Sequence, residues 1–408
     1  MLKKISSCGD PGRKSKNSLS YRAYLFPVLC LTAIFYLNFV SRIILSPMIT
    51  AVESDLGMSH GKSGSLFFFV TMGYFISLIG SGYVNSKVTH RITVIFSSVF
   101  LGLALIGISF TKTAFGLGAG MFLVGIGAGA YLPSGIASIT HIADRRQWGK
   151  ALAVHEIAPN FAFLSVPFMA EALFLWFSWR EVEAIIGIIA IAVGVLYAVI
   201  GRGGEFSGEV PNYGSITVLF RRPSFLLMIF LLSLGIASSM GLFTMLPLYL
   251  VDHCGLTRTH ANAIIGLSRM APLALVFIGG WTTDHFGAAR TIKWVFLITG
   301  TITVFFGIVP SNMISVIVFL QPVVAIWFFP AFFALLSSIV PKQSRSLAVS
   351  FSTPVAFLAG GGIVPMAIGT MADMNLFPLA MSLVGVVILS GGLILTFKKP
   401  IADFNGIS

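Results

Sequence analysis

Long runs of hydrophobic residues recur along the whole chain, separated by short polar segments. Each run is long enough to cross a bilayer as a helix, for which about 20 residues are needed. None of the runs alternates hydrophobic and polar residues with a period of two, as the strands of a membrane β-barrel do, so helices are predicted. The twelve predicted spans are residues 25–47, 63–84, 92–110, 114–138, 151–173, 182–201, 223–250, 261–281, 292–310, 313–339, 347–371 and 378–397.

The composition is that of an integral membrane protein. Hydrophobic residues make up 56% of the 408 residues, and charged residues only 10%. A soluble domain carries about 25% charged residues, and no soluble fold of this length hides so much apolar surface. The three cysteines, Cys8, Cys30 and Cys254, are too far apart for a disulfide framework or a metal-ligand pattern. Disordered chains, disulfide scaffolds and soluble enzymes are therefore excluded.

The basic residues predict how the chain is oriented. Lys and Arg exceed Asp and Glu by 26 to 14, a net charge of +12. On the side of the predicted N-terminal tail lie 20 of the basic residues, whereas the opposite side has four: Lys62, Lys112, Arg180 and Arg258. The positive-inside rule then places both termini in the cytoplasm. We expect a multi-pass protein of a bacterial inner membrane, with basic residues that touch anionic lipids at the cytoplasmic face and no nucleic-acid partner.

Two landmarks recur at nearly the same spacing and indicate an internal repeat. The segment 82–91 after the second span resembles 280–290 after the eighth, 198 residues later, and 144–150 after the fourth is matched by 341–346 after the tenth, 197 residues later. Repeats of this kind occur in transporters, with the substrate site near the midplane between the halves. The expected organisation is a cytoplasmic tail 1–24, a six-helix half 25–201, a cytoplasmic linker 202–222, a second six-helix half 223–397 and a cytoplasmic tail 398–408.

The loop after the eighth span carries the most specific motif. It reads Gly280-x-x-x-Asp284-His285-x-Gly287-x-x-Arg290, which matches the G-x-x-x-D-[RK]-x-G-x-x-[RK] signature of the major facilitator superfamily, with a histidine in a basic position. With the span count and the repeat, the chain resembles that superfamily over essentially its whole length. The resemblance implies an all-α membrane protein of twelve transmembrane helices in two six-helix halves, which transports a small molecule by alternating access.

Glycines are dense in the fourth span, at Gly125, Gly127, Gly129 and Gly135, and this pattern is similar to the fourth helix of the superfamily. Glycine lets helix backbones approach closely. We therefore expect these residues to pack against neighbouring helices rather than to contact the substrate.

Arg42 is one of two basic residues that lie inside a predicted span and away from its ends. An ionisable residue there costs about 2.5–3.5 kcal/mol on insertion scales, so it usually faces a cavity or a partner. Asn38, Arg42 and Ser46 recur every four residues and form a polar face on an apolar helix. The stretch 38–47 resembles the first helix of superfamily members that carry organic anions and phosphate esters, in which an arginine meets the substrate. Arg42 and Asn38 are the expected substrate ligands; the alternative is a structural ion pair with an acid such as Glu171.

Arg269 lies near the middle of the eighth span and shares a face with Asn262. Carboxylate carriers of the superfamily also have a central arginine in this helix. Shifted by the repeat, Arg42 corresponds to Met240 and Arg269 to Thr71, so neither arginine belongs to the repeated scaffold. One arginine from each half suits an anionic substrate, because a guanidinium donates two parallel hydrogen bonds to a carboxylate or phosphate. Arg269 and Asn262 are therefore expected to share one substrate cavity with Arg42.

The fifth span contains three ionisable residues, His155, Glu156 and Glu171. A partly buried carboxyl is suited to carrying a proton, because burial disfavours its charged form. Glu156 with His155 is the candidate proton-coupling pair; the alternative for Glu156 is an acid that stabilises a helix N-terminus. Glu171, near the other end of the helix, is a further candidate for coupling, for an outer gate, or for pairing with Arg42.

Two short motifs resemble enzyme sites but lack an essential residue. The segment 57–63 is one residue too short between its glycines for a phosphate-binding loop, and no buried strand precedes it. His155-Glu156 is followed by Pro159 where a zinc protease needs its second histidine. No enzyme activity, cofactor or metal is expected.

The preferred function is transport of a small organic anion that bears a carboxylate or a phosphate, coupled to protons, by a monomer. One alternative is proton-driven efflux of amphipathic compounds, favoured by 37 Phe and 15 Met that suit an adaptable pocket. An alternative of another class is a transporter-like receptor that binds its ligand without moving it.

The charge distribution makes a topology prediction. A cysteine at Lys112 should react with a membrane-impermeant maleimide from outside intact cells, whereas one at Lys150 should react only after the cells are opened, because positive loops stay in the cytoplasm. Labelling of position 150 from outside would contradict both the orientation and the six-plus-six arrangement.

Overall fold

The structure is a computed structural model that describes residues 21–144, 147–208, 219–340 and 345–397. Within them, eleven helices are long and apolar enough to cross a membrane, and a bent pair completes a twelfth. This confirms the predicted all-α architecture. Residues 1–20 of the predicted N-terminal tail, 209–218 of the predicted linker and the predicted C-terminal tail 398–408 lie outside the described residues. The first helix, α1 (Tyr21–Ile43), begins inside the predicted N-terminal tail.

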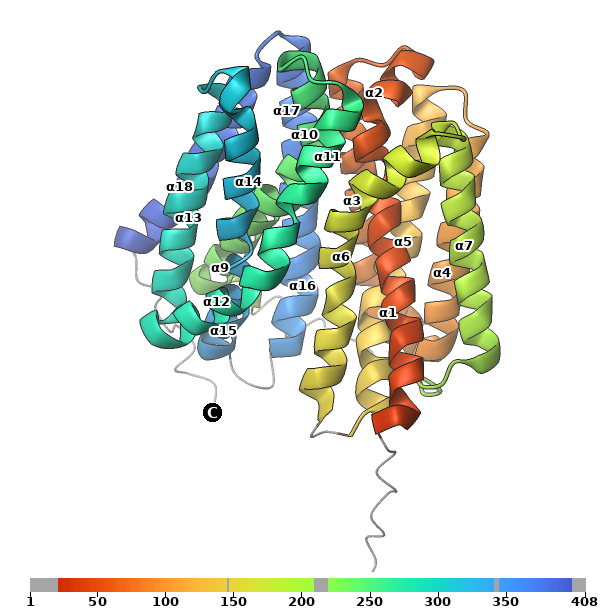
Figure 1. The fold of residues 1–408 in the computed structure, drawn as a ribbon. Coiled ribbons are helices and arrows are strands. Elements are labelled where there is room, and N and C mark those ends of the chain that lie inside the picture. Colours follow the sequence, from red (N-terminus) through yellow and green to blue (C-terminus); the bar gives the residue numbers. More distant parts are fainter. Residues whose placement is uncertain (1–20, 145–146, 209–218, 341–344, 398–408) are drawn as a thin grey trace, which may run out of the picture.

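Two groups of helices stand side by side (Figure 1). The first half contains α1 (Tyr21–Ile43), α2 (Leu45–Leu56), α3 (His60–Lys87), α4 (His90–Ser109), α5 (Ala114–Ile142), α6 (Trp148–Phe174) and α7 (Trp179–Ile200). The second half contains α9 (Pro223–Ile236), η2 (Ala237–Gly241), α10 (Leu242–Leu248), η3 (Tyr249–His253), α11 (Arg258–Ser268), α12 (Met270–Phe286), α13 (Ala288–Val304), α14 (Ile314–Ala325), α15 (Phe328–Ile339), α16 (Arg345–Leu358), η7 (Ala359–Ile363), α17 (Val364–Asp373) and α18 (Phe377–Phe397).

Several predicted spans are broken rather than continuous. The first span is divided between α1 and α2 and continues to Leu56, and the eighth is divided between α11 and α12, with a 45° bend farther on. Pro47 and Pro272 follow these two breaks. Proline has no N–H for the carbonyl four residues earlier and clashes with it, so a helix bends or ends just before it.

Helices within each half pack at glycine contacts. A Cβ on Gly125 would lie 2.0 Å from the Val70 carbonyl oxygen, and one on Gly129 would lie 2.5 Å from that of Tyr74. The glycines of the fourth span therefore allow α5 to touch α3 backbone to backbone, which confirms the predicted packing role.

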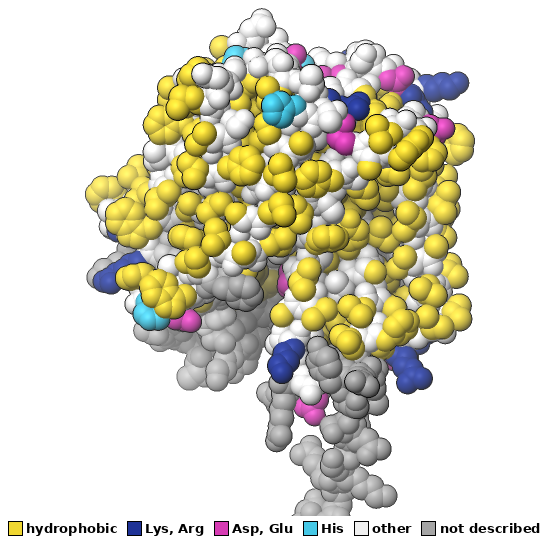
Figure 2. Space-filling model, viewed as in Figure 1, with side chains coloured by type: hydrophobic (Ala, Val, Ile, Leu, Met, Phe, Trp, Pro, Cys, Tyr) yellow, Lys and Arg dark blue, Asp and Glu magenta, His cyan; other side chains and the backbone are white. Residues whose placement is uncertain are grey.

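The two halves meet mainly at one end of the molecule, which we call the closed end. There α17 packs against α3, α10 against α2, and α11 against α6. A Cβ on Gly64 would lie 2.4 Å from the Pro365 carbonyl oxygen, so α3 and α17 touch backbone to backbone. The opposite end, where α1 begins and α18 ends, we call the terminal end. Figure 2 shows a hollow between the halves at the terminal end, and a belt of hydrophobic side chains between the charged groups of the two ends.

Two glycines of α3 provide a matched test of this packing. A Cβ on Gly73 would lie 2.1 Å from the backbone oxygen of Phe122, whereas one on Gly80 would meet nothing within 4 Å. Gly73→Ala should lower the free energy of unfolding by about 1–3 kcal/mol through overpacking, and Gly80→Ala should not lower it. Thermal melting of the purified proteins measures both, and equal melting temperatures would contradict the close α3–α5 contact.

Candidate functional site

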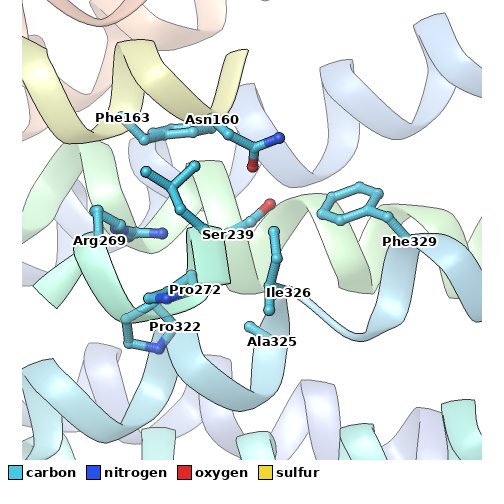
Figure 3. A pocket seen from close by; sticks show the side chains of 10 residues that line it. Asn160, Phe163, Ser239, Arg269, Pro272, Pro322, Ala325, Ile326 and Phe329 are labelled. Atoms are coloured by element: carbon cyan, nitrogen blue, oxygen red, sulfur yellow. The ribbon is translucent and has the colours of Figure 1, made fainter. Parts of the chain in front are cut away.

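A small cavity of about 40 Å³ lies between the two halves, near the middle of the helices. Figure 3 shows Arg269 and Phe329 reaching toward it from opposite sides. A cavity of this size holds a few waters or a small ion in this conformation. Its walls come from α6 of the first half and from η2, α12, α14 and α15 of the second: Asn160, Phe163, Ser239, Arg269, Pro272, Leu273, Pro322, Ala325, Ile326 and Phe329.

Arg269 is positioned by the break in the eighth span, at the junction of α11 and α12. Its guanidinium carbon lies 5.4 Å from the ring centre of Phe163 and 5.0 Å from that of Phe243. Its Nε–H is buried and has no hydrogen-bond partner among the described residues. The charge is thus stabilised by aromatic faces and is free to meet an anion.

Arg42 is even more enclosed, with 1% of the residue exposed. Its Nε donates to the Asn38 carbonyl oxygen at 3.3 Å, but neither terminal nitrogen has a hydrogen-bond partner in the described part of the chain. The guanidinium carbon lies 4.0, 4.6 and 5.3 Å from the ring centres of Phe39, Tyr74 and Phe357. A buried cation whose N–H groups are not all paired is costly unless something else satisfies them.

The expectation that both arginines face one cavity is wrong for this conformation. Only Arg269 lines the cavity. Arg42 is connected to it through the rings of Phe39 and Phe163, whose centres are 6.0 Å apart. The alternative pairing of Arg42 with Glu171 is also wrong, because Glu171 has another partner.

Glu171 belongs to a polar cluster at the closed end. Its carboxylate accepts from Arg258 Nε at 2.8 Å, from Thr259 Oγ1 at 2.8 Å and from Asn262 Nδ2 at 2.7 Å, all three on α11. Asn262 Nδ2 also donates to the Pro47 carbonyl oxygen at 3.0 Å. The cluster therefore joins the two halves, which fits the gate role that the sequence analysis left open for Glu171.

The two predicted asparagine ligands lie elsewhere than expected. Asn262 is in the closed-end cluster just described, away from the cavity. Asn38 is buried and its Nδ2 donates to the Ala128 carbonyl oxygen at 2.9 Å, which joins α1 to α5. Both amide groups donate to the backbone of another helix, and neither residue lines the cavity.

His155 and Glu156 form a second polar arrangement on α6. The Tyr131 hydroxyl donates to the Leu31 carbonyl oxygen at 2.7 Å and lies 3.0 Å from His155 Nε2. Because the hydroxyl proton is already used, Nε2 must carry the N–H that reaches Tyr131. In the neutral imidazole the other nitrogen, Nδ1, is then a bare acceptor, and it lies 3.5 Å from a Glu156 carboxylate oxygen. Two acceptors face each other, so this pair is completed only by a proton.

Burial differs sharply within this pair. The His155 side chain is fully buried and stacks on Phe35 at 4.2 Å between ring centres, whereas 57% of the Glu156 side chain is exposed. The carboxyl that was expected to be partly buried is thus the exposed member of the pair, beside a fully buried imidazole.

The loop motif lies at the terminal end, between α12 and α13. Gly287 has φ of +86°, a left-handed conformation that glycine adopts without strain, as expected for a tight turn. A Cβ on Gly280 would meet nothing within 4 Å. Asp284 and Arg290 are exposed, and no ion pair of either is seen within the described residues.

Sequence patterns alone miss several polar residues that the fold brings together. At the closed end, Glu53, His60 and Asp252 come from three different helices, and only their place near span ends hints at a shared role. Glu183 of α7 is fully buried, with no partner for either carboxylate oxygen among the described residues. Its position inside the predicted span 182–201 is a signal from which the sequence could have identified Glu183.

Several curated relatives of the chain are named for small anions, and others are named only as TsgA homologues. The chain is 22% identical to the "Nitrite extrusion protein" of Bacillus subtilis (strain 168), over 64% of this chain and 65% of that protein. It is 20% identical to the "Probable sulfoacetate transporter SauU" of Cupriavidus necator, over 45% and 42%, and 22% identical to the "Probable nitrate transporter NarT" of Staphylococcus epidermidis, over 65% and 68%. The chain thus spans less than two thirds of the length of the first two.

Solved structures share the fold at low identity. A bacterial homologue of the human lysosomal transporter Spinster, described as inward-facing and occupied, superposes with a TM-score of 0.78 at 15% identity, over 92% of this chain and 96% of the other. A D-xylose-proton symporter superposes with a TM-score of 0.76 at 16% identity, over 94% and 100%. The profile of the Major Facilitator Superfamily matches residues 31–365. With the fold and the signature loop, this match shows that the chain is a member of the Major Facilitator Superfamily.

Proposed function

We propose that this protein is a secondary transporter of a small anion, which binds between the halves and is exchanged by alternating access. One observation carries the proposal. Arg42 and Arg269 each place a guanidinium in the apolar interior, and no described acid pairs with either. Since an unpaired cation at membrane depth is expensive, a ligand of opposite charge is the natural partner.

The interface supports a role for both arginines in the transport cycle. Arg42 of the first half lies against Phe357 of the second, and Arg269 of the second half lies against Phe163 of the first. When the halves rock, each guanidinium loses a ring of the opposite half. A bound anion then replaces this stabilisation, and its two oxygens match the parallel N–H groups of a guanidinium.

The names of the relatives favour the same ligand chemistry. Nitrite, nitrate and sulfoacetate are all small oxyanions, and the last of them is organic. We propose a small oxyanion as substrate, with an organic carboxylate or phosphate ester as the form that the first-helix resemblance favours. Efflux of an amphipathic compound remains the alternative that a cationic substrate would favour.

Proton coupling is proposed for His155 and Glu156. The bare Nδ1 of His155 and the Glu156 carboxylate face each other at 3.5 Å and share one missing proton. Glu156 is the exposed member, so it exchanges the proton with water while His155 holds the pair in place.

The proposed setting is a bacterial inner membrane with both termini in the cytoplasm. The terminal end then faces the cytoplasm, and the closed end faces outward. The basic loops at the terminal end would meet anionic lipid headgroups. The transporter would act as a monomer.

Lysine variants of the two arginines test the substrate site. Arg42→Lys and Arg269→Lys keep the charge but lose the planar pair of N–H donors, which removes about one hydrogen bond to a charged group, worth about 1.5–3 kcal/mol. Anion affinity should fall roughly tenfold to a hundredfold or more. The double variant should lose less than the sum, because both groups would hold one ligand. Calorimetric titration with nitrate, nitrite, sulfoacetate and acetate measures this.

Arg91→Lys is the matched control. Arg91 pairs with Glu205 at 2.9 Å, outside the cavity, so its replacement should leave affinity unchanged. A drop in melting temperature for the Arg42 and Arg269 variants without a drop in affinity would assign both arginines to structure. Binding of only neutral or cationic compounds would overturn the anion proposal.

Glu156→Gln tests proton coupling. The amide cannot carry the proton, so a pH gradient should no longer drive accumulation of the anion in proteoliposomes, while exchange across the membrane without a gradient should continue. Exchange in the same vesicles is the internal control for folding. Accumulation at the wild-type level would exclude Glu156 as the proton carrier.

A further inference from the structure

A histidine at the closed end stands between carboxylates of the two halves. His60, the first residue of α3, has Nδ1 3.1 Å from the carboxylate oxygens of Glu53 on α2. Its Nε2 lies 3.4 Å from a carboxylate oxygen of Asp252 in η3. Glu53 and His60 belong to the first half and Asp252 to the second, so the imidazole bridges the interface.

The valence of imidazole makes this contact depend on a proton. A neutral imidazole has one N–H donor, and its other nitrogen is an acceptor. With both nitrogens facing carboxylates, one of the two contacts would place a lone pair against a negative oxygen. The bridge is satisfied only if the imidazole carries both protons or if one carboxyl is protonated.

The surroundings supply no other charge that removes this need. Among the described residues, the charged groups near His60 are Glu53 on α2, Asp252 in η3 and Asp373 at the end of α17. Asp373 is already engaged, since one of its oxygens accepts from Ser59 Oγ at 2.8 Å and from the Gly61 backbone N–H at 3.1 Å. The ring of Phe377, 5.9 Å from the imidazole, is the aromatic neighbour on α18. All three neighbouring charges are acidic, so they favour an added proton.

The site is also placed for exchange with water. The Asp252 side chain is 52% exposed and that of His60 is 23% exposed, whereas Glu53 is 11% exposed. The bridge therefore has a buried half, Glu53, and an accessible half, Asp252. When the halves separate at this end, Asp252 leaves, and a neutral imidazole that donates to Glu53 suffices.

We propose that the Glu53–His60–Asp252 bridge is a proton-binding site that takes up one proton each time the closed end closes and releases it each time that end opens. Low pH on this side then favours closure, and the closed population falls as pH rises. One linked proton changes the open-to-closed ratio by up to tenfold per pH unit. This inference rests on the alternation of two states in the proposed function, but on neither the substrate nor Glu156.

Distance measurements across the closed end test the proposal. In a variant without its native cysteines, spin labels at Lys112 in the first half and Asn312 in the second, both exposed, report the separation of the halves by pulsed electron paramagnetic resonance. Without substrate, the ratio of long to short distances should rise with pH between 5.5 and 8.5, by up to tenfold per unit. A ratio that does not change across this range would overturn the proposal.

Asp252→Asn is the diagnostic variant. The amide of asparagine can donate to a neutral imidazole nitrogen, so closure no longer needs a proton. This variant should remain closed at high pH with its pH dependence lost, whereas His60→Gln should lose the pH dependence and favour the open state. The exposed His260 of α11 is the matched control, because His260→Gln should keep the wild-type slope.

A wild-type slope in Asp252→Asn would overturn the proposed site. These results are distinct from those of the substrate proposal. Anion affinity at Arg42 and Arg269 can be intact while the closed end is insensitive to pH, and the reverse outcome is equally measurable.

Discussion

Two buried cations at the interface of the halves, with no acidic partner among the described residues, are the constraint that organises the centre of this protein. Charge at this depth is tolerated when aromatic faces and backbone carbonyls take part of the role of water. The structure arranges this reciprocally, with Arg42 against Phe357 and Arg269 against Phe163, each ring belonging to the opposite half. The arginines and the interface are therefore one system, and movement of one half alters the surroundings of both charges.

The breaks in the helices lie next to the same two buried arginines. Arg42 lies one residue before the end of α1, and Arg269 lies at the junction of α11 and α12. Irregular backbone is tolerated within a membrane where it lies inside protein or lines a cavity. Pro47 and Pro272 account for both breaks, and the guanidinium groups beside these breaks contact rings of the opposite half.

Much of the fold was predictable because it depends on local patterns. Hydrophobic runs fix the spans, and equal offsets between loops reveal the repeat. The same offsets show that Arg42 and Arg269 have no symmetric copies, and the structure gives this a physical meaning. Their counterparts Met240 and Thr71 lie together against Gly361, where a Cβ would be 3.4 and 3.5 Å from their atoms. Met240 and Thr71 thus serve helix packing, whereas Arg42 and Arg269, at the corresponding positions of the other half, carry charge.

What the sequence did not predict depends on contacts between distant helices. Pairing with Arg42 was one of the roles left open for Glu171, but Glu171 binds Arg258, which is 87 residues away and was predicted to lie in a loop. The two arginines were expected to share one cavity, yet aromatic packing between α1, α6 and α10 separates them in this conformation. Helical spacing gives the face on which a residue lies, but the residue it meets depends on how two helices cross.

Within the described residues, the strongest polar contacts between the halves gather at one end, and this would give the proposed alternating access a physical basis. At the closed end, charged and hydrogen-bonded groups join α2, α3 and α6 to η3, α11 and α17. Near the centre the halves touch through rings and glycines, which allow the surfaces to tilt because they impose little directional bonding. In the proposed function, opening of the closed end has to break these few polar contacts. A single proton at the proposed His60 bridge would be enough to change the balance between the two proposed states, since a tenfold population shift needs only about 1.4 kcal/mol.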